Sequence, residues 1–423
     1  MAEALALSLF AAGYLAITME HRIFVNKAAA SLLLAVVLWV VTSFSLPVVE
    51  VRHFLTEISA DIFGLIIFLL TAMTLVEILV HYHLFDVLEK WLRSRGWTTY
   101  HMAWALTGLT FIFSAILDNL TTTIVMIQIA RRLFPKQELL AVGALLVIVA
   151  NAGGAFSPIG DVTTLMLWFA GKFTASQILI QGFLPSLVMA TIPSYLILRH
   201  IHKKSRIPAD CDHDFRPSRS DRAIMLATLG SFLLPLGASF VGLPPYMGLL
   251  AGLGIVWVLI DFAKRARPQN THLQASIHSF LQKTDIESLQ FFVGILLAVG
   301  ALHALGILDW ATEALLGSTP SWVRLVTAFV GLGLGSAVVD NVPLTAAAIS
   351  ALDGISSSLW TLLAITVGTG GSLLVIGSAA GVVAMGMIKE MTFLRYFKIA
   401  TYPALLGFLG AVVVWAVQYK LFL

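Results

Sequence analysis

Long apolar runs, separated by short polar segments, occupy almost the whole chain. Most of these runs contain close to the ~20 residues that a helix needs to cross a bilayer core about 30 Å thick. Little sequence remains for a separate soluble domain. The pattern predicts an all-helical polytopic membrane protein, whose ten crossings cover residues 4–20, 28–46, 61–80, 138–170, 176–198, 222–240, 245–262, 285–304, 358–389 and 398–419.

Two further apolar stretches, 101–130 and 321–352, do not fit a simple crossing. Each holds an Asp-Asn pair near its middle, which begins at Asp118 in the first stretch and at Asp340 in the second. A straight helix would place these polar side chains at the most costly depth of the bilayer. A re-entrant helical hairpin, with its tip buried in protein or in a wet cavity, removes the conflict. We therefore expect two such hairpins.

Two glycine-rich segments predict breaks inside the crossings 138–170 and 358–389. Residues 151–161 read NAGGAFSPIGD, and residues 368–378 read GTGGSLLVIGS. Glycine and proline interrupt a helix and free backbone carbonyls, which can act as ion ligands. A glycine pair in a membrane helix can equally serve close helix packing, so both interpretations stay open.

The two halves of the chain carry similar motifs in the same order. SAILDNLTTT at 114–123 matches SAVVDNVPLT at 336–345, and the two glycine-rich breaks match each other. Each half then holds five crossings and one hairpin, and because five is odd, the second half has the opposite orientation in the membrane. Inverted repeats with interrupted helices are typical of secondary transporters. We assign residues 1–198 and 222–423 to the two repeats and 199–221 to a polar cytoplasmic linker.

Composition excludes the soluble classes of protein. Hydrophobic residues make up 58% of the 423 residues and charged residues 12%, whereas soluble domains carry about 25% charged residues. A soluble enzyme and a nucleic-acid-binding protein are therefore excluded. The single cysteine, Cys211, has no partner for a disulfide within the chain.

The distribution of basic residues predicts the orientation in the membrane. With the N-terminus outside, Arg52, Lys172, Arg324 and Lys420 lie in exterior segments, and the other 22 of the 26 Lys and Arg lie inside. This asymmetry follows the positive-inside rule and places both termini on the periplasmic or extracellular side. No basic segment precedes the first apolar run, so we expect no cleavable signal peptide. We expect a multi-pass protein of a bacterial inner (plasma) membrane.

Oxygen-bearing side chains cluster at the hairpin tips and at the helix breaks. Hard cations such as sodium prefer carboxylate, carbonyl and hydroxyl ligands, and an intramembrane Asp indicates function because its insertion costs about 2.5–3.5 kcal/mol. A lone Ser or Thr commonly bonds back to its own helix instead. The candidates for ion binding and proton exchange are Asp118, Asn119, Thr122, Thr123, Asn151, Gly153, Ser157, Asp161, Thr164, Asp340, Asn341, Thr345, Thr369, Ser372 and Ser378. The predicted sodium ligands among them are Asp118, Asn119, Asn151, Asp161, Asp340 and Asn341.

Glu77 and His81 lie on one face near the cytoplasmic end of the third crossing, because residues four apart are neighbours on a helix. They could form a proton relay or a pH sensor, since a histidine titrates near neutral pH. An interfacial pair that reaches toward the membrane surface fits the spacing equally well. Both interpretations stay open.

Taken together, the paired Asp-Asn tips and the two glycine-rich breaks resemble those of NhaD-type sodium/proton antiporters. These belong to an ion-transporter superfamily with the dicarboxylate/sodium symporters and arsenite exporters. The resemblance covers the chain from about Asp61 to the C-terminus. It implies a homodimer in which a scaffold forms the interface and a transport domain with both hairpins moves as a rigid body. It also implies a transporter and no enzyme, without a cofactor, whose substrates are sodium or lithium ions and protons.

The tip residues favour a cation over an organic anion. Dicarboxylate relatives carry Ser-Asn-Thr where this chain has Asp118 and Asp340 before the Asn, and a carboxylate at the site repels an anionic substrate. We also expect no Lys or Arg within the predicted crossings to neutralise such a substrate. A sodium-coupled dicarboxylate symporter or an arsenite exporter remains the alternative. An intramembrane aspartyl protease, in which two Asp share a proton, is disfavoured by the inverted repeat.

The expected mechanism is competition for one site. If an Asp at the site holds either a proton or a sodium ion, the two ligands exclude each other, and alternating access of that site suffices for exchange. The exchange carboxylates are predicted to be Asp118, Asp340 and Asp161. We expect exchange to increase toward alkaline pH, with sodium export and pH homeostasis as the physiological role.

Overall fold

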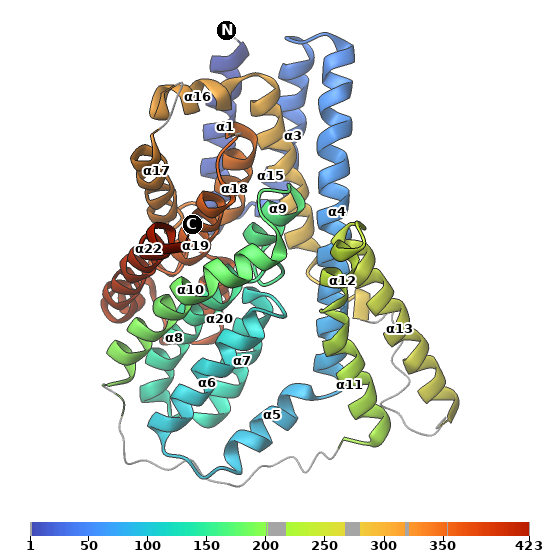
Figure 1. The fold of residues 1–423 in the computed structure, drawn as a ribbon, viewed down its shortest axis with the longest axis vertical. Coiled ribbons are helices and arrows are strands. Elements are labelled where there is room, and N and C mark those ends of the chain that lie inside the picture. Colours follow the sequence, from blue (N-terminus) through green and yellow to red (C-terminus); the bar gives the residue numbers. More distant parts are fainter. Residues whose placement is uncertain are drawn as a thin grey trace.

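The computed structural model describes residues 2–199, 201, 217–266, 280–317, 321–352 and 354–422, and every regular element within these ranges is a helix (Figure 1). The all-helical class expected from the sequence is therefore confirmed for the described residues. Most of the linker 199–221, with Cys211, lies outside them.

The described helices divide between the two halves of the chain. The first half contains α1 (Ala2–Thr18), α2 (Glu20–Ile23), α3 (Lys27–Ser43), α4 (Val48–His81), α5 (Leu84–Arg93), α6 (Thr99–Ser114), α7 (Asn119–Leu133), α8 (Lys136–Ala155), α9 (Val162–Phe169) and α10 (Ala175–Leu198). The second half contains α11 (Arg219–Ser231), α12 (Leu234–Phe240), α13 (Pro245–Ala266), α15 (Ile286–Ala304), α16 (Ile307–Leu316), α17 (Trp322–Gly335), α18 (Asn341–Ala351), α19 (Ser357–Gly370), α20 (Ala379–Met387), α21 (Phe393–Tyr396), the π-helical turn η2 (Phe397–Thr401) and α22 (Tyr402–Phe422).

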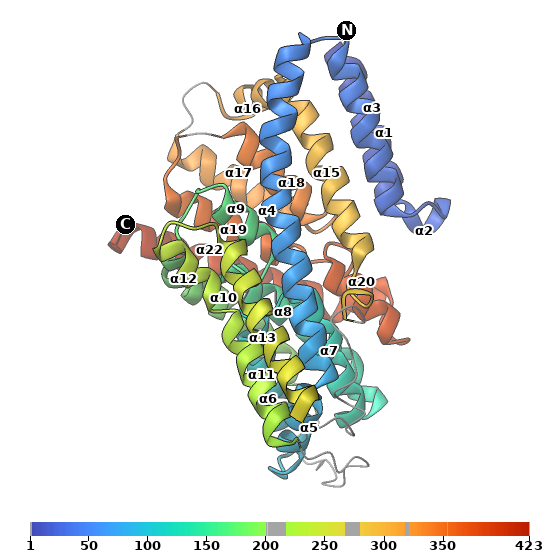
Figure 2. The same ribbon diagram turned by 90° about the vertical axis from the view of Figure 1, so that its right-hand side faces the viewer.

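One group of helices, which we call the frame, consists of α1, α3, α4, α11, α12, α13 and α15 (Figure 2). Helix α3 packs along both α1 and α15, while α4 contacts α15, α11 and α13. Gly294 of α15 allows close approach to α3, because a Cβ at this position would meet Ser31. The indole nitrogen of Trp39 donates a hydrogen bond of 2.9 Å to the carbonyl of Leu297. Small residues and such bonds hold helices together where lipid supplies no hydrophobic driving force.

The second group, which we call the hairpin group, consists of α6 to α10 and α17 to α22. Its central helices are α8 and α19, which are buried along almost their whole length. Helices α6, α7 and α10 pack on α8, and α17, α10 and α22 pack on α19. The hairpin group meets the frame where α18 contacts α15 and where α9 contacts α4. This boundary contains the polar cavity described below.

Two short helices join the frame to the hairpin group. Helix α5 connects α4 to α6, and α16 connects α15 to α17; they lie at opposite ends of the molecule (Figure 1). Each follows a single residue in the left-handed region, His83 at φ 59° before α5 and Gly306 at φ 68° before α16. The chain therefore turns sharply at both places as it leaves the frame.

The predicted interruptions fall where the sequence placed them. Both hairpin segments fold as two helices with the Asp-Asn pair at the junction, α6 with α7 and α17 with α18. The two glycine-rich crossings are likewise broken, between α8 and α9 and between α19 and α20. The structure thus has an interruption between helices at each of these four places, while the re-entrant course of the two hairpins in the membrane stays a prediction.

Two predicted boundaries were wrong, and one predicted crossing is divided into two helices. Helix α4 begins at Val48 instead of residue 61, since Glu50 and Glu57 lie on an exposed helical extension and not in a loop. The crossing 222–240 divides into α11 and α12, with Pro235 in the first turn of α12. The last crossing belongs to a longer helical segment, which starts with α21 and continues through η2 into α22. Charged residues outside the apolar run do not end helix α4, and Pro235 marks the division of a helix that the apolar run alone predicts as continuous.

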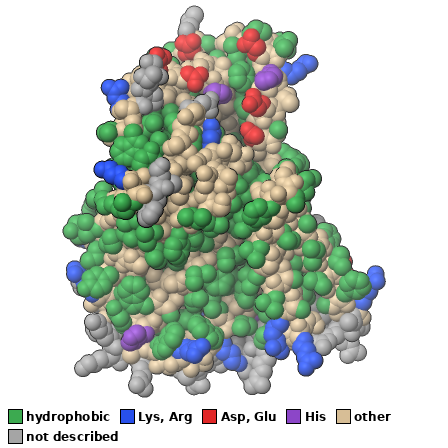
Figure 3. Space-filling view, viewed as in Figure 1, with side chains coloured by type: hydrophobic (Ala, Val, Ile, Leu, Met, Phe, Trp, Pro, Cys, Tyr) green, Lys and Arg blue, Asp and Glu red, His purple; other side chains and the backbone are tan. Residues whose placement is uncertain are grey.

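The described chain contains seven helical segments that are long and apolar enough to cross a membrane, with α1, α3 and α17 as shorter apolar helices. Hydrophobic side chains cover the middle of the molecular surface, while acidic side chains gather near the upper end and basic ones along the lower edge of the view (Figure 3). The apolar side chains of Leu33 and Val36 in α3 are 67% and 62% exposed, as expected of residues in contact with lipid. The protein is a multi-pass membrane protein.

Candidate ion-binding site

Four helix N-termini converge on the boundary between the frame and the hairpin group. The first residue of each is preceded by a polar side chain that accepts a hydrogen bond from the helix backbone: Asp118 from Thr121 (2.7 Å), Asp161 from Thr163 (2.9 Å), Asp340 from Val342 (3.0 Å) and Ser378 from Gly381 (3.2 Å). A helix N-terminus carries partial positive charge, which by itself favours an anion. The carboxylates at three of the four positions offset this charge, so that the site can accept a cation.

Asp161 lies at the centre of this arrangement and is only 2% exposed. Asn119 at the first hairpin tip donates a hydrogen bond of 3.0 Å to its Oδ2. Asn341 at the second tip donates one of 3.3 Å to its Oδ1. The hydroxyl of Thr163 donates a further bond of 3.0 Å to Oδ1. Both hairpin tips, which are far apart in the sequence, therefore meet on one carboxylate.

Asn151 links the two broken crossings and is completely buried. Its Nδ2 donates hydrogen bonds to the hydroxyls of Ser372 (3.2 Å) and Ser378 (3.1 Å), both in the second break. Its Oδ1 accepts a bond of 3.0 Å from Asn119. Because buried amides are costly to leave without partners, this network fixes the relative positions of one tip and both breaks.

The same backbone contacts occur in both halves. The hydroxyl of Ser114 donates to the carbonyl of Ala150, and that of Ser336 donates to the carbonyl of Val367. These bonds fasten each hairpin to the broken crossing of its own half. The serines occupy the same place in the matched segments SAILDNLTTT and SAVVDNVPLT.

Glycines in the breaks allow the hairpins to approach closely. A Cβ at Gly153 would meet the backbone of Phe111 in the first hairpin, and a Cβ at Gly370 would meet the backbone of Gly333 in the second. The structure thus places Gly153 in a close helix contact, which was one of its two interpretations. Its role as an ion ligand stays a prediction.

A cavity of about 70 Å³ lies among the converging elements. Its polar lining residues include Asp118, Asn119, Asp161, Asp340, Asn341 and Ser378. The three carboxylates are close enough for their charges to interact. One water needs roughly 10–15 Å³ of such space, so the cavity has room for a cation together with water.

Comparisons with known proteins agree with this arrangement. A family model described as "Citrate transporter" matches residues 14–368. The chain is 38% identical to Sodium/proton antiporter 1 of Arabidopsis thaliana, over 98% of this chain and 72% of that protein. It is 31% identical to the Na(+)/H(+) antiporter NhaD of Halomonas elongata, over 97% of this chain and 87% of that protein. The chain belongs to the NhaD family.

A solved structure shares the fold of this NhaD-family chain. The YdaH transporter of Alcanivorax borkumensis superposes with a TM-score of 0.57 over 94% of this chain and 98% of that chain. The two sequences are 15% identical. This likeness extends to the fold alone.

Several predicted residues of this NhaD-family site are near the cavity but do not line it. Their side chains bond to nearby backbone or lie between helices. Thr123 and Thr345 donate to the carbonyls of the tip residues Asn119 and Asn341, four positions earlier in their own helices. Three further hydroxyls also donate to backbone carbonyls: that of Thr369 to Ile365, that of Thr164 to Asp161 and that of Ser157 to Ala115. The buried hydroxyl of Thr122 has no hydrogen-bond partner.

Glu77 and His81 do not line the cavity. Both lie toward the end of α4, where Glu77 is near enough to Lys283 for their charges to interact and His81 forms an edge contact with Phe280 at 5.1 Å between ring centroids. A direct role at the site is therefore not supported by their position. Their role in relay or pH sensing stays a prediction.

Sequence reasoning missed two residues close to the hairpin tip at Asp340. Lys27, which is the first residue of α3 and directly precedes the predicted crossing 28–46, lines the cavity from the frame. The hydroxyl of Tyr14 accepts a bond of 3.1 Å from the backbone N–H of Asp340. The Asn-Lys pair directly before the apolar run 28–46 is a helix-start signal that places Lys27 at the end of the crossing, but the sequence alone does not bring it to the hairpin tip.

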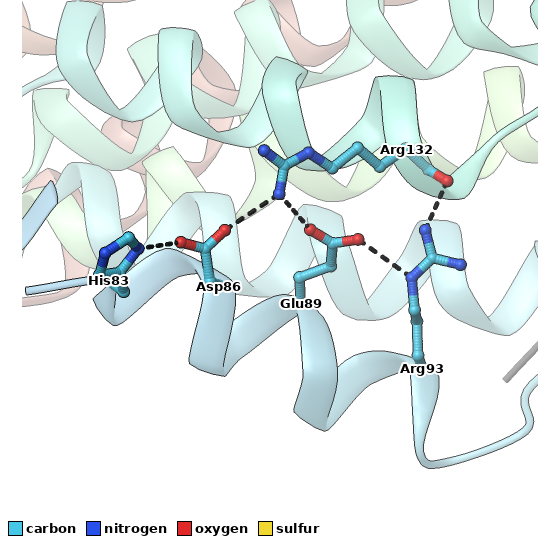
Figure 4. Close-up of polar contacts among 5 residues, drawn as sticks. All are labelled: His83, Asp86, Glu89, Arg93 and Arg132. Carbon is cyan, nitrogen blue, oxygen red and sulfur yellow. Dashed lines mark hydrogen bonds and ion pairs between the residues drawn. The ribbon is translucent and has the colours of Figure 1, made fainter. Parts of the chain in front are cut away.

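A second polar cluster joins α5 to the end of α7 (Figure 4). Arg132 donates from Nη1 to Asp86 at 3.0 Å and to Glu89 at 2.8 Å. Arg93 donates to Glu89 at 3.0 Å and to the carbonyl of Arg132 at 2.7 Å, and His83 contacts Asp86 at 2.7 Å. Burial acts to raise the pKa of Asp86, but the hydrogen bonds and charges of His83 and Arg132 outweigh it and hold this pKa below its usual value. The cluster fixes the connector on the first hairpin.

Proposed function

We propose that the protein is a sodium/proton antiporter that exports sodium, or lithium, from the cytoplasm in exchange for protons. The observation that carries this proposal is the meeting of both hairpin tips on Asp161, with Asp118 and Asp340 beside the same cavity. Named antiporters among the relatives that cover nearly the whole chain support the same function. The ions are substrates, and no cofactor is required.

Exchange follows from competition at the carboxylates. A sodium ion and a proton cannot occupy the same carboxylate oxygen together, so binding of one releases the other. Asp118, Asp161 and Asp340 are the exchange groups, and the amide oxygens of Asn119, Asn151 and Asn341 complete the sodium ligands. Higher pH leaves the carboxylates free of protons more often, so we expect faster exchange at alkaline pH.

Alternating access is proposed to arise from movement of the hairpin group against the frame. Residues 1–198 and 222–423 form two inverted repeats, and the recurrence of the same serine and glycine contacts in both halves supports this. The short helices α5 and α16, at opposite ends of the molecule, serve as the connections that reorient. The frame forms the interface of a homodimer, and both chain termini lie on the outer side.

Dissipation of a preformed pH gradient tests the proposal. Inside-out vesicles from cells that lack their own antiporters would receive sodium, lithium, potassium or succinate at pH 7 and pH 9. We expect sodium and lithium to dissipate the gradient, more strongly at the higher pH. Failure of both ions, together with uptake of succinate or arsenite, would overturn the proposal in favour of an anion transporter of the same superfamily.

A further inference from the structure

Lys27 is held at a defined place on the frame. The side chain of Asn26 accepts a hydrogen bond of 2.8 Å from the backbone of Ala28 and so starts helix α3. The backbone N–H of Lys27 donates to Glu20 at 3.3 Å. Helix α3 is in turn packed along α15. The backbone of Lys27, from which the side chain extends, is therefore held in place independently of the hairpin group.

The charged end of Lys27 lies over an aromatic ring that borders the ion site. Its Nζ lies 5.2 Å from the ring centroid of Phe291 in α15. Lys27 lines both the 70 Å³ cavity and an adjoining cavity of about 310 Å³ that shares Asp340 and Ser378 with it. Its charge is close enough to interact with that of Asp340. An ammonium group thus lies next to the place proposed for sodium.

The charges around the two cavities are strongly unequal. Asp118, Asp161 and Asp340 line the smaller cavity, while Glu20 and Asp285 line the larger one. Among the described residues, Lys27 is the only Lys or Arg that lines either cavity. A transport site must release its ion as well as bind it, and five carboxylates without a counter-charge would hold a cation tightly.

We propose that Lys27 is a tethered counter-cation, which lowers the sodium affinity of the site while the site is open to the larger cavity. The inference rests on the proposed sodium/proton exchange and adds a residue that sets its affinity. Lys27 belongs to the frame and Asp340 to a hairpin tip, so movement of the hairpin group would separate the two charges. The repulsion between Lys27 and sodium then acts in only one state of the transport cycle. In that state, sodium enters or leaves the site through the larger cavity.

Charge removal with a matched control tests this role. Lys27→Gln removes the charge, and Lys27→Arg retains it. Lys172→Gln is the control, because its Nζ also lies over an aromatic ring, 5.0 Å from the centroid of Trp360, but lines neither cavity. The half-saturating sodium concentration and the maximal rate of exchange would be measured in inside-out vesicles. In the proposed orientation, these vesicles expose the side of the membrane to which the larger cavity opens.

We expect Lys27→Gln to lower the half-saturating sodium concentration about three- to tenfold, as loss of a nearby, partly screened charge predicts. Lys27→Arg should stay within about twofold of the wild type, because it keeps the charge, and Lys172→Gln should match the wild type. An unchanged or higher value in Lys27→Gln, or equal shifts in the Gln and Arg variants, would overturn the inference.

A second measurement, sodium binding to the purified protein, tests the inference even if a variant does not transport. Sodium-dependent thermal stabilisation at fixed pH would be titrated for the wild type and both Lys27 variants. Tighter binding in Lys27→Gln alone supports the counter-cation, and equal binding overturns it. The proposed function fails separately, if the wild type itself moves no protons on addition of sodium.

Discussion

At the residue scale, the site is built around one carboxylate that holds two separate tips. Asp161 accepts hydrogen bonds from Asn119 and Asn341 at once, and its own helix supplies a further bond through Thr163. The carboxylate that makes most contacts is thus the one that organises the site. Asp118 and Asp340 are less buried and border the cavity, where an ion can reach them.

Each of the three Asp residues is expected to be required for exchange. Replacing Asp118, Asp161 or Asp340 singly with Asn keeps the size of the side chain but removes its charge and its proton exchange. We expect loss of sodium-dependent proton movement in vesicles, while folded protein is retained as judged by gel filtration. Asp309→Asn on α16 is the control and should transport normally. Full exchange in Asp118→Asn would show that this residue is no exchange carboxylate.

The glycine contacts make a prediction about stability. Gly153→Ala and Gly370→Ala would drive a Cβ into the backbone of the adjacent hairpin, which cannot rotate away as a side chain can. Overpacking of this kind costs about 1–3 kcal/mol, so both variants should unfold at lower temperature in detergent. Gly254→Ala in α13, where a Cβ meets no atom within 4 Å, is the matched control. Wild-type melting of Gly153→Ala would contradict the close contact.

At the element scale, the short connectors decide how the frame and the hairpin group are coupled. Helix α5 is fastened to α7 by charged hydrogen bonds, and Glu89 in this cluster is buried although it is ionisable. A buried charge is tolerated because two arginines satisfy it. The connector and the first hairpin should therefore move together.

Loss of Arg132 tests this coupling. Arg132→Ala removes the hydrogen bonds to Asp86 and Glu89, so that Glu89 keeps only Arg93 among the residues drawn in Figure 4. Because charged hydrogen bonds contribute about 1.5–3 kcal/mol each when buried and less when exposed, we expect a lower melting temperature and slower exchange. Arg131→Ala, the exposed neighbour on the same helix, is the control. Equal behaviour of the two variants would count against the coupling.

At the scale of the whole molecule, two sets of helices meet at a polar cavity that neither set could form alone. The frame supplies Lys27, and the hairpin group supplies the three Asp residues. The two groups touch mainly where α15 meets α18 and α4 meets α9. A limited boundary with the site inside it is suited to relative movement of the groups.

The single cysteine allows the proposed orientation to be tested. Cys211 lies in the linker that is predicted to be cytoplasmic. A membrane-impermeant thiol reagent should label it in inside-out vesicles and leave it unlabelled in intact cells. Cys211→Ser is the control for background labelling. Labelling from the outside of intact cells would reverse the orientation of the whole chain.

The sequence by itself determined the helical class, the four helix interruptions and the carboxylates at them, for a local reason. The length of an apolar run, glycine and proline affect helix formation locally, along the segment in which they occur. A charged group in a membrane segment is costly whatever tertiary structure the chain adopts. It did not determine boundaries such as the start of α4, because charged residues outside the apolar core are compatible with both a loop and an extended helix.

Only the tertiary structure decided which of these residues meet. The sequence could not reveal that Asn119 and Asn341 share Asp161, that Gly153 contacts a hairpin backbone, or that Lys27 and Asp340, from different groups of helices, line one cavity. Such contacts join positions hundreds of residues apart, and they depend on how whole helices pack. No periodicity or motif along the chain records that packing.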